Sequence, residues 1–70
     1  MEEKAMRCGS LLLQIADAEF PKERNLREFI WENLEEVGTV LAEDIEWYQK
    51  MPEEDVARDY IWYMLKHLEF

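Results

Sequence analysis

The sequence predicts an all-α fold, a small three-helix bundle around a long central helix. Apolar residues from Leu26 to Tyr48 recur three and four positions apart, which places them on one side of an α-helix and excludes a strand. Pro21 and Pro52 mark two boundaries between such patterns. With 49% hydrophobic residues the chain is too apolar for disorder, and its 70 residues suffice for a single helical domain, 1–70.

The first helix is predicted from Glu2 to about Glu19. One line of its surface would be apolar, and contains Ala5, Cys8, Leu12 and Ile15. Gly9 and Ser10 interrupt the pattern, so a shorter helix from Leu11 with Ser10 as its N-cap is the alternative. Because Cys8 lies on the apolar line, we expect a small buried hydrophobe rather than a reactive thiol.

The central helix is predicted from about Lys22 to Lys50. Gly38 is the only residue that favours a break, since glycine costs about 1 kcal/mol against alanine within a helix. The apolar stripe nevertheless continues past Gly38 without a change of phase, which predicts a continuous helix with a kink or a close helix crossing there. The stripe consists of Leu26, Ile30, Leu34, Val37, Leu41, Ile45 and Tyr48.

A second apolar line on the central helix predicts a second packing neighbour. It contains Phe29, Val40 and Trp47. Asn33 and Asp44 lie between the two lines, either at a seam that reaches the surface or as a polar pair that sets the register in the core.

The last helix is predicted from about Pro52 to Leu68. Its first turn carries Glu53, Glu54 and Asp55, where the helix dipole favours negative charge. The residues expected to be buried are Val56, Ala57, Tyr60, Ile61, Tyr63, Met64, Leu65 and Leu68. The short proline-containing turns predict that the outer helices fold back antiparallel on the central one.

The net charge of −9 is concentrated in one part of the chain. Residues 1–27 carry five acids and five bases, whereas residues 28–70 carry twelve acids and three bases. Such a surface repels nucleic acid and anionic lipid and attracts basic protein surfaces over about 8–10 Å. We therefore expect the partner to be a basic surface of a larger protein, with no direct contact to nucleic acid or a membrane.

The sequence also predicts a cytoplasmic protein. No apolar run approaches the ~18 residues of a membrane span, and the residues after Met1, Glu-Glu-Lys, lack the order of a signal peptide. A single cysteine fits a reducing compartment.

The candidate partner-binding residues are acids on two helices and one tryptophan. They are Glu28, Glu32, Glu35, Glu43 and Glu46 opposite the central stripe, and Asp55, Asp59 and Trp62 on the polar face of the last helix. Acids four positions apart on a helix lie about 6 Å from one another, so the row resembles the phosphates of a nucleic-acid strand. Tryptophan is enriched at interface hot spots. The alternative is a face that only keeps the protein in solution.

No catalytic, cofactor or metal motif is present, but two segments resemble a known family. Residues 35–39 and 55–65 resemble the all-α nucleotide pyrophosphohydrolases of the MazG type. That family carries Glu-x-x-Glu on one helix and Glu-x-x-Asp on the next, which implies bound magnesium. Aligned on Glu36 and Asp59, the other two ligand positions hold threonine and valine, so half of the ligands are missing.

These observations predict a small acidic protein-binding module, without enzymatic activity, cofactor or metal. It would occupy a basic surface of a larger, nucleic-acid-handling partner and inhibit or regulate it, as small phage or mobile-element inhibitors that mimic nucleic acid do. One alternative is a homodimeric helical adaptor that self-associates through a tryptophan-lined arc containing Trp31 and Trp47. The other is a degenerate MazG-like pyrophosphohydrolase.

Overall fold

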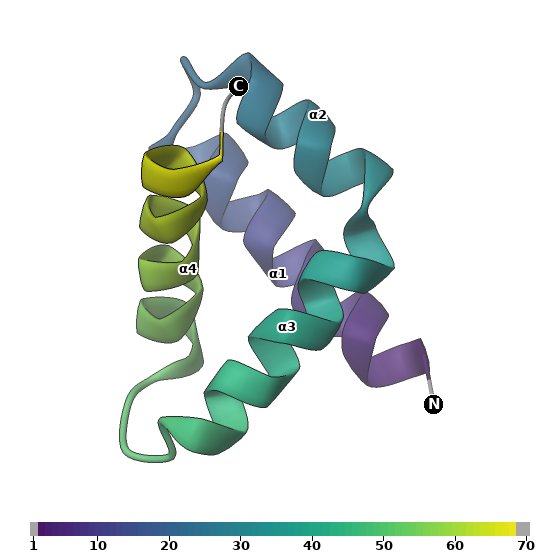
Figure 1. The fold of residues 1–70 in the computed structure, drawn as a ribbon, viewed down its shortest axis with the longest axis vertical. Helices are drawn as coiled ribbons and strands as arrows, with labels where there is room; N and C mark the ends of the chain where they lie inside the picture. Colours follow the sequence, from purple (N-terminus) through teal and green to yellow (C-terminus); the bar gives the residue numbers. More distant parts are fainter. Residues whose placement is uncertain (1, 69–70) are drawn as a thin grey trace.

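Four helices make up the regular structure of this chain in a computed structural model, which describes residues 2–68. They are α1 (Glu2–Glu19), α2 (Arg24–Glu32), α3 (Leu34–Trp47) and α4 (Glu53–His67), as Figure 1 shows. No strand occurs within the described range, so the predicted all-α class is confirmed. None of these helices is both long and apolar enough to cross a membrane.

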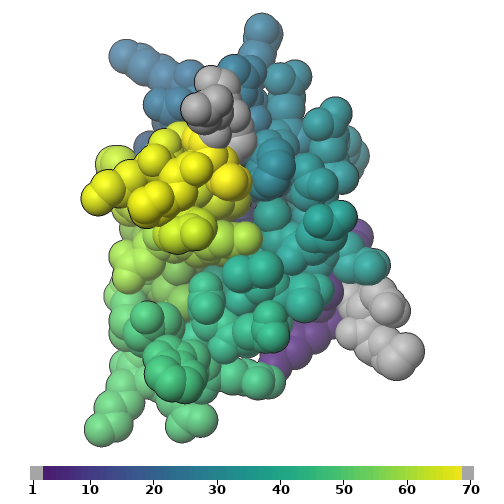
Figure 2. Space-filling view, viewed as in Figure 1, coloured from purple at the N-terminus to yellow at the C-terminus, as the bar shows by residue number. Residues whose placement is uncertain are grey.

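The first helix, α1, makes the most extensive contacts with the rest of the fold. α1 contacts each of the other three helices and contacts α3 most extensively. It is continuous through Gly9 and Ser10, so the alternative start at Leu11 is wrong. Cys8 and Leu12 are fully buried, as their place on the apolar line predicts. In the space-filling view the other three helices hide most of α1 (Figure 2).

The predicted continuous helix from Lys22 to Lys50 is wrong, because the chain turns at Asn33. Asn33 has φ −122° and ψ 34°, outside the α-helical region, and separates α2 from α3. Its side-chain Nδ2 and its backbone N–H both donate to the carbonyl oxygen of Phe29, at 2.9 and 3.0 Å. The backbone bond is the ordinary i to i−4 bond that closes α2, and the side-chain amide shares its acceptor. The Asn33 carbonyl in turn accepts from the Val37 N–H at 2.9 Å, so α3 begins directly after the turn.

Size explains why the turn is needed. A straight helix over residues 22–50 would be about 43 Å long, at 1.5 Å per residue. The longest principal extent of the whole molecule is only 29 Å. The turn at Asn33 lets both α2 and α3 pack against α1, whereas a straight rod would leave one end without a neighbour (Figure 1).

The helices α1 and α3 cross with their backbones in contact. A Cβ placed on Gly38 would collide with the carbonyl oxygen of Ala5 and lie 2.8 Å from the backbone nitrogen of Gly9. A Cβ on Gly9 would in turn collide with the carbonyl oxygen of Leu34. Of the two features predicted as alternatives at Gly38, a kink or a close helix crossing, the structure shows the crossing, and Gly9 supplies the matching gap on α1.

The apolar stripe keeps its place in the core although the helix is broken. Leu26 and Ile30 of α2 and Val37 and Leu41 of α3 are all buried. A break of one residue turns the chain without moving the apolar positions off the side that faces α1. The core cluster comprises Cys8, Leu12, Ile15, Ala16, Leu26, Ile30, Val37, Leu41, Val56, Ala57, Ile61 and Met64.

Several residues predicted to pack in the interior lie at the surface. Tyr48 is 48% exposed, Tyr63 56%, Leu68 39% and Trp47 80%. Phe29 does pack against the core, but no second neighbour covers the rest of its predicted line. Asn33 and Asp44 do not form the polar core pair considered above, because Asn33 bonds to the backbone of α2 while Asp44 lies between α3 and α4. With only four short helices, α3 has neighbours on too few sides to bury its whole apolar arc.

Gly38→Ala tests the backbone contact. Helix propensity alone would make this change stabilising by about 1 kcal/mol. Because the new Cβ collides with the backbone of α1, we expect instead a loss of about 2 kcal/mol or more in the free energy of unfolding, measured with urea. The matched control is Thr39→Ala on the exposed side of α3, which should cost less than about 0.5 kcal/mol. Equal stabilities of the two variants would contradict the close crossing.

Candidate functional site

The five acids predicted as one row lie on two helices. Glu28 and Glu32 belong to α2, whereas the remaining three, Glu35, Glu43 and Glu46, belong to α3. All five are exposed, as predicted. Because α2 and α3 run in different directions after the turn at Asn33, a single straight row of acids is wrong (Figure 1).

Two of these five acids lie beside basic side chains of the same chain. Lys4 donates to Glu46 Oε1 at 2.8 Å, and this hydrogen bond and charge lower the pKa of the Glu46 carboxyl. Glu28 lines a shallow groove together with Arg24 and Arg27, so the local charge there is mixed. The other three acids of the predicted row form no salt bridge with a described residue; they are Glu32, Glu35 and Glu43.

Two of the three residues predicted on α4 face the end of α1. The Arg58 guanidinium joins the helices, with Nη1 donating to Asp55 Oδ1 and Nε to Glu19 Oε1, both at 2.7 Å. The Trp62 ring contacts Phe20 edge to face, with centroids 5.2 Å apart, yet it remains 59% exposed. Trp62 is therefore held in place on one side and open to solvent on the other.

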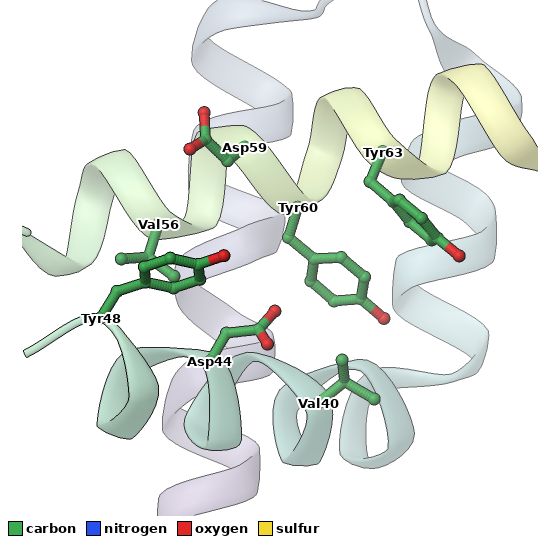
Figure 3. Close-up of a pocket in the computed structure, with 7 residues that line it drawn as sticks. All are labelled: Val40, Asp44, Tyr48, Val56, Asp59, Tyr60 and Tyr63. Atoms are coloured by element: carbon green, nitrogen blue, oxygen red, sulfur yellow. The ribbon is translucent and has the colours of Figure 1, made fainter.

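Asp59, the third predicted residue on α4, lies at the edge of a different feature, a cleft between α3 and α4. The cleft has a volume of about 410 Å³. Its lining combines acids, tyrosines and valines, namely Val40, Asp44, Tyr48, Val56, Asp59, Tyr60 and Tyr63 (Figure 3). The three tyrosines come from the end of α3 and from α4, so only the packing of these helices brings them together.

Asp44 carries an uncompensated negative charge in this cleft. Its carboxylate points into the space between the Tyr48 and Tyr60 rings (Figure 3). It forms no salt bridge with any described residue. Partial burial, and then the charge of Glu43, raise the pKa of the Asp44 carboxyl. Burial likewise raises the pKa of Tyr60, with a further contribution from Asp44.

A carboxylate between aromatic rings is suited to binding a cation. The carboxylate supplies charge and hydrogen-bond acceptors, and the ring faces attract positive charge. The sequence does not predict this site, because the helical spacing of Tyr60 and Tyr63 predicts positions in the core. One signal was present in the sequence, since Asp44 is an acid inside the apolar arc of α3.

The residues with other reactive side chains do not line this cleft. Cys8 is buried, which raises the pKa of its thiol. His67 is exposed and its ring lies 4.6 Å from that of Tyr63. Val56, at a ligand position of the MazG-type pattern, is part of the core and 2% exposed. The described residues contain no group of three or more His, Cys, Asp or Glu arranged to hold a metal ion.

Comparisons with known proteins found no protein-family model, no curated protein and no solved structure that matches this chain.

Asp44→Asn tests the environment of the cleft. The folded-state pKa of Asp44 lies above its ordinary value of 3.8, so the charged carboxylate is less favourable in the folded protein than in the unfolded chain. The contribution of Asp44 to the free energy of unfolding is therefore fully present at low pH and is lost as pH rises through the folded-state pKa. We expect the variant to be more stable than the wild type at pH 7, by roughly a few tenths of a kcal/mol in this half-open site, and the difference to shrink by pH 3.

The matched control for this experiment is Glu36→Gln, an exposed position on the same helix with the same change in charge. It separates the local effect from the general relief of charge repulsion in an acidic protein. An Asp44→Asn variant whose thermal unfolding follows the control at every pH would contradict a raised pKa at Asp44.

Proposed function

We propose that this protein is a small acidic binding module, without enzymatic activity, that occupies a basic surface of a larger nucleic-acid-handling protein and thereby inhibits or regulates it. The observation that carries the proposal is the exposure, on one small domain, of unpaired acids together with large aromatic side chains. Acids alone would serve solubility equally well. Aromatic side chains left in water have a cost that contact with a partner would remove.

The unpaired acids would speed the encounter with a basic partner. Glu32, Glu35 and Glu43 are exposed and have no salt-bridge partner among the described residues. The net charge of −9 adds a long-range field to these local charges. Such fields raise association rates at low salt and are screened within about 8–10 Å at physiological salt.

Tryptophans would supply the contact area that holds the complex together. Trp31 is 67% exposed, Trp47 80% and Trp62 59%. Tryptophan is among the residues most enriched at interface hot spots, because its large ring excludes water and its indole N–H can still donate. The acids would thus speed association with the partner, and the tryptophans would slow dissociation from it.

A nucleic-acid-handling partner is the class whose basic surface such a module would fit best. Proteins that bind nucleic acid carry lysine and arginine patches that contact phosphates. Since the acids of α2 and α3 do not form one straight row, competition with nucleic acid would depend on the overall negative field and not on matched phosphate spacing.

The double variant Glu32→Lys with Glu35→Lys tests this proposal. The wild-type chain is used to capture its partner from host lysate, and association with the purified partner is then measured at about 20 and 200 mM salt. We expect the variant to associate at least about tenfold more slowly at low salt, and much less affected at high salt. Duplex DNA should compete with the wild-type chain for the partner.

Glu3→Lys with Glu23→Lys is the matched control, because it changes the net charge equally at exposed positions outside the acidic set. Equal association rates for the two double variants would contradict a role for the acids of α2 and α3. Magnesium-dependent release of pyrophosphate from nucleoside triphosphates by the pure protein would contradict the absence of enzymatic activity.

Self-association is a second candidate function, favoured by the exposure of Trp47 at the end of α3. A homodimeric adaptor would bury this ring and its exposed neighbour Tyr48 against a second copy. Sedimentation velocity at micromolar concentration should then show a dimer for the wild type and a monomer for Trp47→Ser. A wild-type monomer under these conditions would exclude the homodimer as the working form.

A further inference from the structure

We propose that the cleft between α3 and α4 receives an arginine side chain of the basic partner. This inference rests on the proposed function, because it names the group that the partner would insert. It goes further because it places specific recognition in the cleft and not at the exposed acids of α2 and α3. Of the sequence-predicted binding residues, only Asp59 lines this cleft.

The cleft is large enough to admit one long side chain. Its volume of about 410 Å³ lies at the lower end of the range for small-molecule sites, roughly 300–1,000 Å³. Valines contribute apolar surface at its wall and floor: Val40 is 40% exposed and Val56 belongs to the core. The methylene stem of an arginine could lie along these valines while the guanidinium reaches the acid.

The negative charge of the cleft favours a cation as its ligand. Asp44 has no salt-bridge partner among the described residues. Glu43, whose charge acts on Asp44, and Asp59, which lines the same cleft, are also acids. Figure 3 shows the Asp59 carboxylate directed away from α3, which leaves Asp44 as the acid inside the cleft. Partial burial removes water from the Asp44 carboxylate, and a bound cation would stabilise the charged carboxylate in place of that water.

Comparison with other grooves supports this choice of site. The groove beside Trp31 is lined by Arg24 and Arg27, and a groove beside Trp47 includes Lys50. A partner's cation would meet a positive charge of the chain in both places. Neither lysine nor arginine lines the cleft between α3 and α4.

The tyrosines favour arginine over lysine. Tyr48 and Tyr63 are 48% and 56% exposed, so part of each ring is accessible to a ligand. A guanidinium is planar, stacks on aromatic faces and binds a carboxylate through two parallel N–H donors. An ammonium group is a point charge with stronger hydration and uses neither feature. The arrangement of one acid among three tyrosines therefore matches a guanidinium better.

The test uses the tripeptide acetyl-Gly-Arg-Gly-amide as the probe. Two matched peptides carry citrulline, which keeps the shape but has no charge, and lysine, which keeps the charge but is not planar. Binding to the full chain is followed by nitrogen-15 NMR. We expect the arginine peptide to shift the amide signals of residues 40–48 and 56–63, the lysine peptide to bind more weakly, and the citrulline peptide to cause no shift.

Variants of the cleft complete the experiment. Asp44→Asn should lower the affinity for the arginine peptide about tenfold, the value of one charge-assisted hydrogen bond. Tyr63→Ala should lower it about two- to fivefold, as expected for an exposed cation–π contact. Glu36→Gln, the charge-matched control, should leave it unchanged. The amide spectrum of each variant shows directly whether it is folded.

Three outcomes would overturn the assignment of the cleft: equal binding of the citrulline peptide, equal binding of the lysine peptide, or shifts confined to the acids of α2 and α3. If any of these occurs while partner association still depends on Glu32 and Glu35, the proposed function stands and the cleft is not its arginine site. If the arginine peptide binds in the cleft but the rate of partner association does not depend on Glu32 and Glu35, the cleft assignment stands and the proposed role of these acids in association is wrong.

Discussion

The contact between the backbones of α1 and α3 is the constraint on which the rest of this fold depends. Helix axes usually lie 8–10 Å apart because side chains keep them separate. Here Gly9 and Gly38 remove the side chains at the crossing, and each gap accepts backbone atoms of the other helix. In a chain of 70 residues this close approach lets a thin layer of apolar side chains form one connected core.

The position of α1 follows from this crossing and explains the turn at Asn33. Because α3 is held against α1 at Gly38, a straight continuation towards the N-terminus would carry Leu26 and Ile30 away from the core. The turn redirects α2 so that both residues remain buried. The turn occupies a single residue, Asn33, whose side-chain amide donates to the carbonyl of Phe29. The rod predicted from the apolar stripe is thus replaced by two helices that share one stripe.

The same arrangement divides the charges of the chain into paired and unpaired sets. The bases of α1 lie beside the acids of the second half, as in the pairs Lys4 with Glu46 and Arg7 with Glu53. Exposed pairs of this kind contribute little to stability, typically below about 1 kcal/mol each. Each pair neutralises one acid. The acids without a salt-bridge partner among the described residues include Glu32, Glu35, Glu43 and, in the cleft, Asp44, which is why steering and recognition are proposed for neighbouring parts of the chain.

The sequence by itself determined the all-α class, the extents of the first and last helices and most of the core positions, and it marked Gly38 as the place for either a kink or a close helix crossing. These properties depend on residues within a few turns of one another, so periodicity, prolines and glycines are enough to predict them. The MazG-type resemblance rested on such local spacing too, and it could not show that Val56 would lie in the core.

Only the tertiary structure decided where the chain turns, which acids are paired and which aromatic residues stay exposed. The apolar stripe is equally consistent with a straight rod and with two helices joined at Asn33, because one turn residue does not disturb its phase. Tyr48 and Tyr63 lie on apolar positions of their own helices, and they are exposed because too few helices surround α3 and α4 to cover them. Burial depends on neighbours from distant parts of the chain, and local spacing carries no information about how many neighbours there are.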